Sequence, residues 1–189
     1  MMPGSKKTKL PQEIVSLHDP NHKGLCMNFA NAATLAYLKD DSHLSIHRRL
    51  FCGIDDIYCL FFGSLNNLCS LMKQYGLTSK GINKAMFVIE AYRTLRDRGP
   101  YPDDQVVKDL EGSFAFIIYD NKDKTVFVSL SSDGGIKLYW GIAADGSIIC
   151  AKSFAPFPAG CMFHSEGGLL NYEHPMFPLN HLIFQKTTK

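Results

Sequence analysis

The sequence has almost no excess of charge of either sign. Its 20 lysines and arginines stand against 18 aspartates and glutamates, which leaves a formal net charge of +2. Binding to nucleic acid or to an anionic membrane surface usually depends on a field of one sign. The one basic cluster, Lys6-Lys7-Thr8-Lys9, is short and typical of a solvated tail. We therefore expect no nucleic-acid partner.

Long hydrophobic runs are missing as well. No apolar stretch reaches the roughly 18 residues that a membrane helix needs. The N-terminal residues are polar and lysine-bearing, without the apolar centre of a signal peptide. We expect no membrane span.

The chain also lacks closely spaced cysteine pairs. Its six cysteines are Cys26, Cys52, Cys59, Cys69, Cys150 and Cys161. None of them forms a CxxC motif, and most of them lie in apolar runs. A secreted disulfide scaffold would be shorter and denser in cysteine. We therefore expect buried, reduced thiols and a cytoplasmic or nuclear location.

A helix that carries histidines at the spacing of zinc ligands is absent too. His43 and His47 are four residues apart, which would suit one helix face, but Leu44-Ser45-Ile46 between them alternates like a strand. His164 and His174 are expected to make local hydrogen bonds. We predict no metal site and no cofactor.

What is present is a pattern of short strands with helices between them. Residues 1–28 show no periodicity and are expected to be mobile. The expected strands are residues 34–38, 50–51, 57–62, 113–119, 125–130, 136–140, 147–150, 161–164 and 169–172. The expected helices run from a cap at Asn66-Asn67 to Gly76, from Asn83 to Gly99-Pro100, and from Asp103 to Leu110. Polar turns between the later strands favour antiparallel hairpins, so the pattern predicts an α+β domain.

Two short sequence motifs stand out in this pattern, Tyr75-Gly76-Leu77 and Leu95-Arg96-Asp97-Arg98. They lie between the stretch 62–68, with the sequence FGSLNNL, and the stretch 131–141, with the sequence SSDGGIKLYWG. In this order they resemble the plant aluminium-induced, stem-specific protein family named for its YGL and LRDR motifs. That family is similar to the class II glutamine amidotransferase half of asparagine synthetase.

The resemblance implies a fold and a domain division. The fold would be the four-layer αββα sandwich of N-terminal-nucleophile hydrolases, incomplete here at both ends. Residues 30–175 would form the amidotransferase-like domain. Residues 1–29 would be a divergent, mobile N-terminal segment, and residues 176–189 a divergent tail.

The resemblance also implies that the catalytic groups have been lost. The nucleophile of such enzymes is a Cys, Ser or Thr at the mature N-terminus, because its own α-amino group serves as the base. This chain begins Met1-Met2-Pro3-Gly4-Ser5. The oxyanion turn of these enzymes is Asn-Gly, and here Phe62 takes the place of the asparagine while Gly63 is retained. The substrate-holding aspartate should fall near Ile82-Asn83-Lys84, where no carboxylate is present. We expect no catalytic residue.

Four residues form the candidate vestigial pocket: Phe62, Gly63, Asn67 and Asp133. The stretch Ser131–Gly135 corresponds to an Arg-Asp hairpin of the synthetases without its arginine, and is expected to be a tight turn. The LRDR arginines could bind an anion. We favour a structural role, because cations suit a helix C-terminus and Arg93 and Asp97 are spaced for an i,i+4 pair.

Three hypotheses about function follow. The first is a catalytically silent amidotransferase-like domain with a binding or regulatory role, stress- or metal-responsive in plants. The second is an active glutamine amidohydrolase that uses another thiol, Cys52 or Cys59. The third is a truncated isoform without independent function. The expected partners are another protein, a second copy of the chain, or an amide or amino-acid ligand.

Overall fold

The computed structural model describes residues 24–29, 33–38, 49–77, 81–98, 104–142, 148–149 and 155–173. The chain divides into two compact units, residues 1–45 and 46–189.

The first unit contains one antiparallel hairpin. Strand β1 (Gly24–Phe29) pairs with β2 (Ala33–Leu38), from Gly24 opposite Leu38 to Phe29 opposite Ala33. The expectation for β2 is confirmed. Strand β1 was not predicted, and it includes residues 24–28 of the stretch in which the sequence shows no periodicity. The sequence GLCMNF has no two-residue alternation, so its strand structure comes from pairing with β2 and not from a local pattern.

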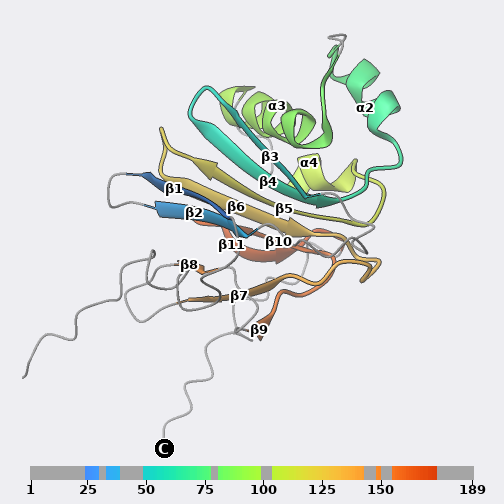
Figure 1. Cartoon of the computed structure of the whole chain (residues 1–189). Coiled ribbons are helices and arrows are strands. Elements are labelled where there is room, and N and C mark those ends of the chain that lie inside the picture. Colours follow the sequence, from blue (N-terminus) through green and yellow to red (C-terminus); the bar gives the residue numbers. More distant parts are fainter. Residues whose placement is uncertain are drawn as a thin grey trace, which may run out of the picture. The chain divides into compact units, whose positions relative to one another are not determined.

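The second unit is built on a six-stranded antiparallel sheet in the order β11-β10-β6-β5-β4-β3 (Figure 1). Its strands are β3 (Arg49–Ile54), β4 (Ile57–Gly63), β5 (Phe114–Asp120), β6 (Thr125–Leu130), β10 (Cys161–His164) and β11 (Gly168–Asn171). β4 and β5 are neighbours along their whole length, from Ile57 opposite Asp120 to Gly63 opposite Phe114. The chain segment 64–113 therefore leaves the sheet and returns beside the strand it left.

Three helices belong to that excursion: α2 (Leu68–Gln74), α3 (Lys84–Arg98) and α4 (Asp104–Lys108). They lie on one side of the sheet (Figure 1). α3 packs on β3 and β4 through the residues that the periodicity predicted, which include Ala85, Val88, Ile89 and Tyr92. Its start is fixed by Asn83, whose Oδ1 accepts a hydrogen bond from the Met86 N–H at 2.9 Å.

A smaller sheet covers part of the opposite face. Its strands are β7 (Tyr139–Ile142), β8 (Ile148–Ile149) and β9 (Ala155–Pro156), in the order β8-β7-β9. Trp140 from β7 packs against Phe157 and against Phe163 of β10. Phe157 is buried as expected, while Phe154 lies outside the described residues.

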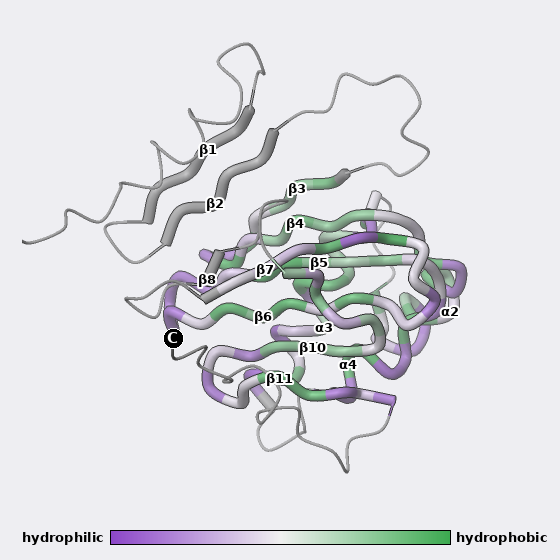
Figure 2. The backbone as a smooth tube through the Cα atoms, turned by 90° about the horizontal axis from the view of Figure 1, so that it is seen from below, coloured by the Kyte–Doolittle hydropathy of each residue, from purple (hydrophilic) through white to green (hydrophobic). Residues whose placement is uncertain are grey.

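The second unit therefore has three layers: helices, the six-stranded sheet and the smaller sheet. The strands β4, β5 and β6 are mostly hydrophobic, because they carry apolar side chains towards both neighbouring layers (Figure 2). The predicted α+β class with antiparallel strands is confirmed. A helical layer outside the smaller sheet is not among the described residues.

Candidate functional site

The candidate site lies where β4 leaves the sheet. Gly63 ends β4 with a φ of 97°, a backbone conformation that side-chain-bearing residues rarely adopt. A Cβ atom on Gly63 would lie 2.1 Å from the Ser113 carbonyl oxygen and 2.5 Å from Ile136 Cδ1. The next residue, Ser64, donates its N–H to the same Ser113 oxygen at 2.8 Å. The turn therefore needs glycine both for its conformation and for its close approach to β5.

The side chains of Phe62 and Lys84 determine which chemical groups this turn presents. The half-buried Phe62 side chain packs with the cluster between the two sheets and carries no hydrogen-bond donor. Lys84, the first residue of α3, donates from Nζ to the Gly63 carbonyl oxygen at 3.2 Å. The turn thus has an aromatic ring in place of the expected amide, and an ammonium group near the position where the resemblance implies a carboxylate.

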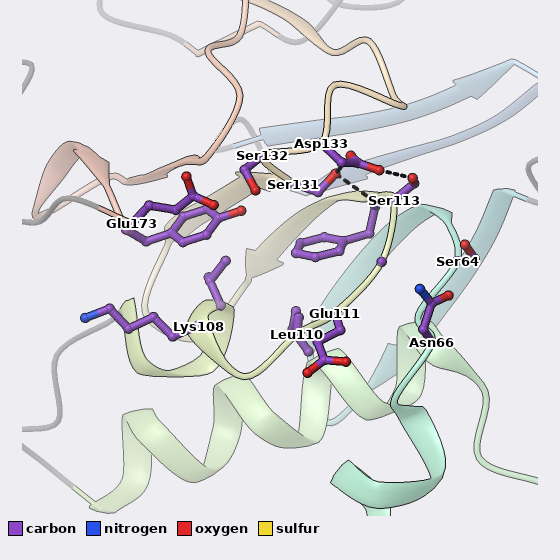
Figure 3. A pocket seen from close by; sticks show the side chains of 14 residues that line it. Ser64, Asn66, Lys108, Leu110, Glu111, Ser113, Ser131, Ser132, Asp133 and Glu173 are labelled. Atoms are coloured by element: carbon purple, nitrogen blue, oxygen red, sulfur yellow. Dashed lines mark hydrogen bonds between the residues drawn. The ribbon is translucent and has the colours of Figure 1, made fainter.

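An open depression of about 940 Å³ lies beside the turn (Figure 3). It is lined by Ser64, Asn66, Val107, Lys108, Leu110, Glu111, Gly112, Ser113, Phe114, Ser131, Ser132, Asp133, Tyr172 and Glu173. Of the four predicted pocket residues, only Asp133 lines the depression. Gly63 and Asn67 do not line it, although the residues next to them, Ser64 and Asn66, do.

Asp133 organises one wall of the depression. Its carboxylate accepts hydrogen bonds from the hydroxyl groups of Ser113 and Ser131, which Figure 3 shows beside it. It also accepts the Gly135 N–H at 3.1 Å. These bonds, and the one from Ser113 most of all, hold the pKa of the Asp133 carboxyl below its usual value. Ser131 also accepts the Phe114 N–H through Oγ at 3.0 Å. The stretch Ser131–Gly135 is therefore a turn tied to the start of β5, in agreement with the predicted tight turn.

Asn67 has a different role from the predicted helix cap. It precedes α2, but its side chain makes no capping hydrogen bond. Its Nδ2 donates to the Asp109 carbonyl oxygen at 2.7 Å, and its Oδ1 accepts the Glu111 N–H at 3.2 Å. Asn67 thus ties the start of α2 to the loop between α4 and β5.

Several residues around the depression were not expected from the sequence. Glu111 lines it from the loop between α4 and β5, and Tyr172 and Glu173 line it from the residues that follow β11. Lys108 is paired with Asp104 on α4. Their convergence depends on strand pairing across the sheet, which leaves no local signal. Lys84 could have been found, because it stands at the position that was already noted to lack a carboxylate.

The YGL motif forms the C-terminal cap of α2. Gly76 has a φ of 67°; its N–H donates to the Lys73 carbonyl, and the Leu77 N–H donates to the Met72 carbonyl at 2.8 Å. This pair of bonds is the Schellman arrangement. Tyr75 packs edge-on against Phe87 of α3 with ring centroids 5.4 Å apart, and Leu77 packs on the core. The expected glycine cap is confirmed, and the motif joins α2 to α3.

The LRDR motif ties the end of α3 to the sheet. Leu95 packs on the core, and Arg96 contacts Asp97 at 2.9 Å and the fully buried Asp120 of β5 at 2.6 Å. The Arg98 side chain lies outside the described part. The predicted Arg93–Asp97 pair is wrong: Arg93 pairs with Asp55 in the β3–β4 turn at 2.8 Å and, at 3.5 Å, with Glu90.

The thiols follow the prediction in part. Cys59 and Cys161 are buried and free, Cys52 is partly exposed, and Cys69 on α2 is exposed, which corrects the expectation for that residue. Burial raises the pKa of the Cys52 and Cys59 thiols and raises that of Cys161 to about 11. The other two cysteines lie in segments whose side chains are not described.

Residues with metal-binding side chains do not cluster in the described part of the chain. No group of three or more His, Cys, Asp or Glu there is placed to hold an ion. His43, His47 and His174 lie outside the described residues, while His164 packs edge-on against Phe127. Among the described helices, none is long and apolar enough to cross a membrane.

Comparison with known proteins places the chain in a family. The stem-specific protein TSJT1 of Nicotiana tabacum is 53% identical over 76 residues, which cover 40% of this chain and 50% of the tobacco protein. The chain thus matches about half the length of that relative. The family described as aluminium induced protein matches residues 2–184.

Two solved structures are also similar. One is the glutamine phosphoribosylpyrophosphate amidotransferase from B. subtilis, with a TM-score of 0.49 and 14% identity over 72% of this chain and 33% of that one. The other is described as the allosteric regulatory enzyme of purine biosynthesis, with a TM-score of 0.48 and 15% identity over 66% of this chain and 31% of that one. The match over residues 2–184 shows that this chain belongs to the aluminium induced protein family.

Proposed function

We propose that this chain is a catalytically silent glutamine amidotransferase-like domain with a binding or regulatory role. The observation that carries the proposal is the Gly63 turn, where Phe62 replaces the oxyanion donor and Lys84 donates to the Gly63 carbonyl. Loss of one oxyanion donor lowers the rate about a hundred- to a thousandfold in enzymes that use such a site.

Lys84 supports the same conclusion through its charge. In the amidotransferases that the sequence resembles, an aspartate holds the amino group of glutamine. At this turn an ammonium group stands 3.2 Å from the Gly63 carbonyl oxygen, and like charges repel. The α-ammonium group of a bound glutamine would therefore be disfavoured in the catalytic orientation.

The candidate binding place is the depression beside the turn. Serine hydroxyl groups and the Glu111 and Glu173 carboxylates lie along its wall, next to Phe114 and Tyr172. Such a wall offers polar groups to an amide or amino-acid ligand in another orientation, and its open form also suits a protein partner or a second copy of the chain. The proposed domain is stress- or metal-responsive in plants and acts in the cytoplasm or nucleus, in keeping with the free thiols and with the family name.

The first experiment measures ammonia release from glutamine by the purified chain, beside the Phe62→Asn variant, which restores the missing amide. The proposal expects no release by the unmodified chain. Ammonia release by the unmodified chain above the spontaneous rate of glutamine would overturn it.

The second experiment is a thermal unfolding scan with millimolar glutamine, asparagine or glutamate. A ligand at 100 times its Kd adds about 2.7 kcal/mol to the free energy of unfolding. A shift with one of these ligands identifies the depression as a small-molecule site, provided that Glu173→Gln reduces it. A cooperative transition that none of them moves favours a protein partner, whereas the absence of a cooperative transition would support a truncated isoform.

The alternative of an active amidohydrolase with Cys52 or Cys59 as nucleophile has less support. A nucleophilic thiol needs a lowered pKa or an adjacent base. Burial instead raises the pKa of both thiols, and the Cys59 side chain is inaccessible to solvent. If ammonia release were found, Cys52→Ser and Cys59→Ser would each be assayed, and full activity in both would exclude this version.

A further inference from the structure

Two of the free cysteines stand directly opposite each other in neighbouring strands. Cys52 of β3 is the register partner of Cys59 of β4, and the two strands are joined by the two-residue turn Asp55-Asp56. Side chains of directly opposite residues in an antiparallel pair project to the same face. Their Cα atoms are about 4.5 to 5.5 Å apart, which lies within the range that a disulfide spans.

The two thiols differ in accessibility. Cys59 is fully buried in the core under α3, whereas Cys52 is partly exposed and packs against the same core cluster. β3 is the last strand of its sheet in the described part of the chain. A dissolved reagent can therefore reach Cys52 first, and Cys59 is the neighbouring thiol that can complete the reaction.

We propose that Cys52 and Cys59 form a reversible cross-strand disulfide, so that the β3–β4 hairpin is a redox-sensitive element. The oxidant is a small disulfide. The Cys52 thiolate attacks one sulfur of the oxidant, forms a mixed disulfide and releases the first small thiolate. Cys59 loses its proton and attacks the Cys52 sulfur, which releases the second. The protein loses two protons and two electrons, and the small disulfide takes them up to become two thiols.

The position of the pair in the hairpin makes this disulfide easy to reduce. A two-residue turn is closed by a hydrogen-bonded pair, here Ile54 and Ile57, and hydrogen-bonded and non-hydrogen-bonded pairs alternate along the strands. Cys52 and Cys59 are then a hydrogen-bonded pair, the wider of the two kinds. The Cβ atoms of such a pair are about 5.5 Å apart, whereas those of a disulfide are about 3.5 to 4.5 Å apart, so bond formation must draw the two Cβ atoms together. Strained disulfides have the more oxidising potentials typical of regulatory bonds.

The rate should depend on pH. Burial raises the pKa of both thiols, so the thiolate fraction is small at neutral pH and grows as the pH rises. Oxidation is therefore expected to be slow at neutral pH and faster at pH 9.

The test uses the full reduced chain incubated with oxidised glutathione, followed by alkylation of the remaining thiols and mass mapping of peptides. The expected product is a peptide pair linked through Cys52 and Cys59, lighter by two hydrogens and separated again by dithiothreitol. Exposed Cys69 is the internal control and should carry a glutathione adduct. Free thiols at both positions while Cys69 is modified would overturn the proposal, as would linkage of Cys52 to a different cysteine.

Two variants test the order of the steps. In Cys59→Ala, Cys52 should keep its glutathione adduct, because the second thiol is gone. In Cys52→Ala, Cys59 should stay unmodified. A linked product in either variant would contradict the assignment, and mapping of the unmodified chain decides the question even if Cys59→Ala folds poorly. In the oxidised protein, slower amide exchange of β3 than in the reduced form is the expected structural effect.

Discussion

Arg96 of α3 and Asp120 of β5 form an ion pair in which Nη1 and Oδ2 are 2.6 Å apart and the carboxylate is fully buried. The other oxygen of Asp120 accepts the N–H groups of Lys122 and Asp123, which shape the β5–β6 turn. One carboxylate therefore joins the end of α3 to the β5–β6 turn.

The first prediction concerns this pair. Arg96→Ala leaves the buried Asp120 carboxylate without its counter-charge, which typically costs about 3 kcal/mol of unfolding free energy. Urea denaturation should show the loss as a lower midpoint at unchanged slope. Asp97→Asn is the matched control, because Asp97 is an exposed partner of the same arginine, and its midpoint should stay close to that of the unmodified chain. Equal effects of the two variants would contradict the assigned role.

A second prediction separates conformational strain from steric clash at glycine. Gly63→Ala should lower the free energy of unfolding by about 3 kcal/mol, because a positive φ and contact with Ser113 and Ile136 act together. Gly134→Ala shares the positive φ but meets no atom within 4 Å, so about 1 kcal/mol is expected. Thermal or urea unfolding of both variants gives the comparison, and similar losses would show that the β4–β5 approach is not tight.

A third prediction distinguishes bridging from capping at Asn67. Asn67→Ala loses the bonds to the Asp109 carbonyl and the Glu111 N–H, worth about 1 to 2 kcal/mol together. Asn67→Ser keeps a good capping residue but cannot span both partners. If the bridge is the role, serine should be nearly as destabilising as alanine in urea unfolding. Recovery of stability with serine would restore the capping interpretation.

The fourth prediction concerns acid stability. The folded-state pKa of Asp133 is lowered, so the unfolded chain binds this proton first as the pH falls. The contribution of Asp133 is therefore present above its unfolded pKa of about 4 and is lost as the pH falls through its lower folded value. The stability difference between the unmodified chain and Asp133→Asn should be constant near neutrality and shrink below about pH 4. Urea titrations across this range measure it, and a constant difference would argue against the lowered pKa.

The elements that the sequence predicted well are those with a local pattern. The α3 face and the boundaries of β6 follow from periodicity and polar turns, and Gly76 was recognisable as a cap from its place after an apolar helix. β1 was missed because its strand conformation depends on pairing with β2 and not on alternation within its own residues.

The site was less predictable because it depends on distant partners. The Gly63 turn was found by resemblance, but the bridge from Asn67 to the α4–β5 loop and the partner of Arg96 join elements far apart in the chain. Arg93 shows the limit most clearly: helical spacing pointed to Asp97, whereas the fold places Asp55 within reach. Which carboxylate pairs with a helical arginine therefore depends on the tertiary structure wherever another element lies close to the helix.

The pairing of β4 with β5 has a consequence for how the protein folds. The segment 64–113 must be enclosed before these two central strands can meet, and loop closure of that length precedes any gain from the strand contacts. The hairpins β3–β4, β5–β6 and β10–β11 each pair strands that are close in the sequence, so they can form before β4 pairs with β5. During synthesis β4 remains without its inner partner until residue 120 has left the ribosome, and over that interval its apolar residues depend on α3 for cover.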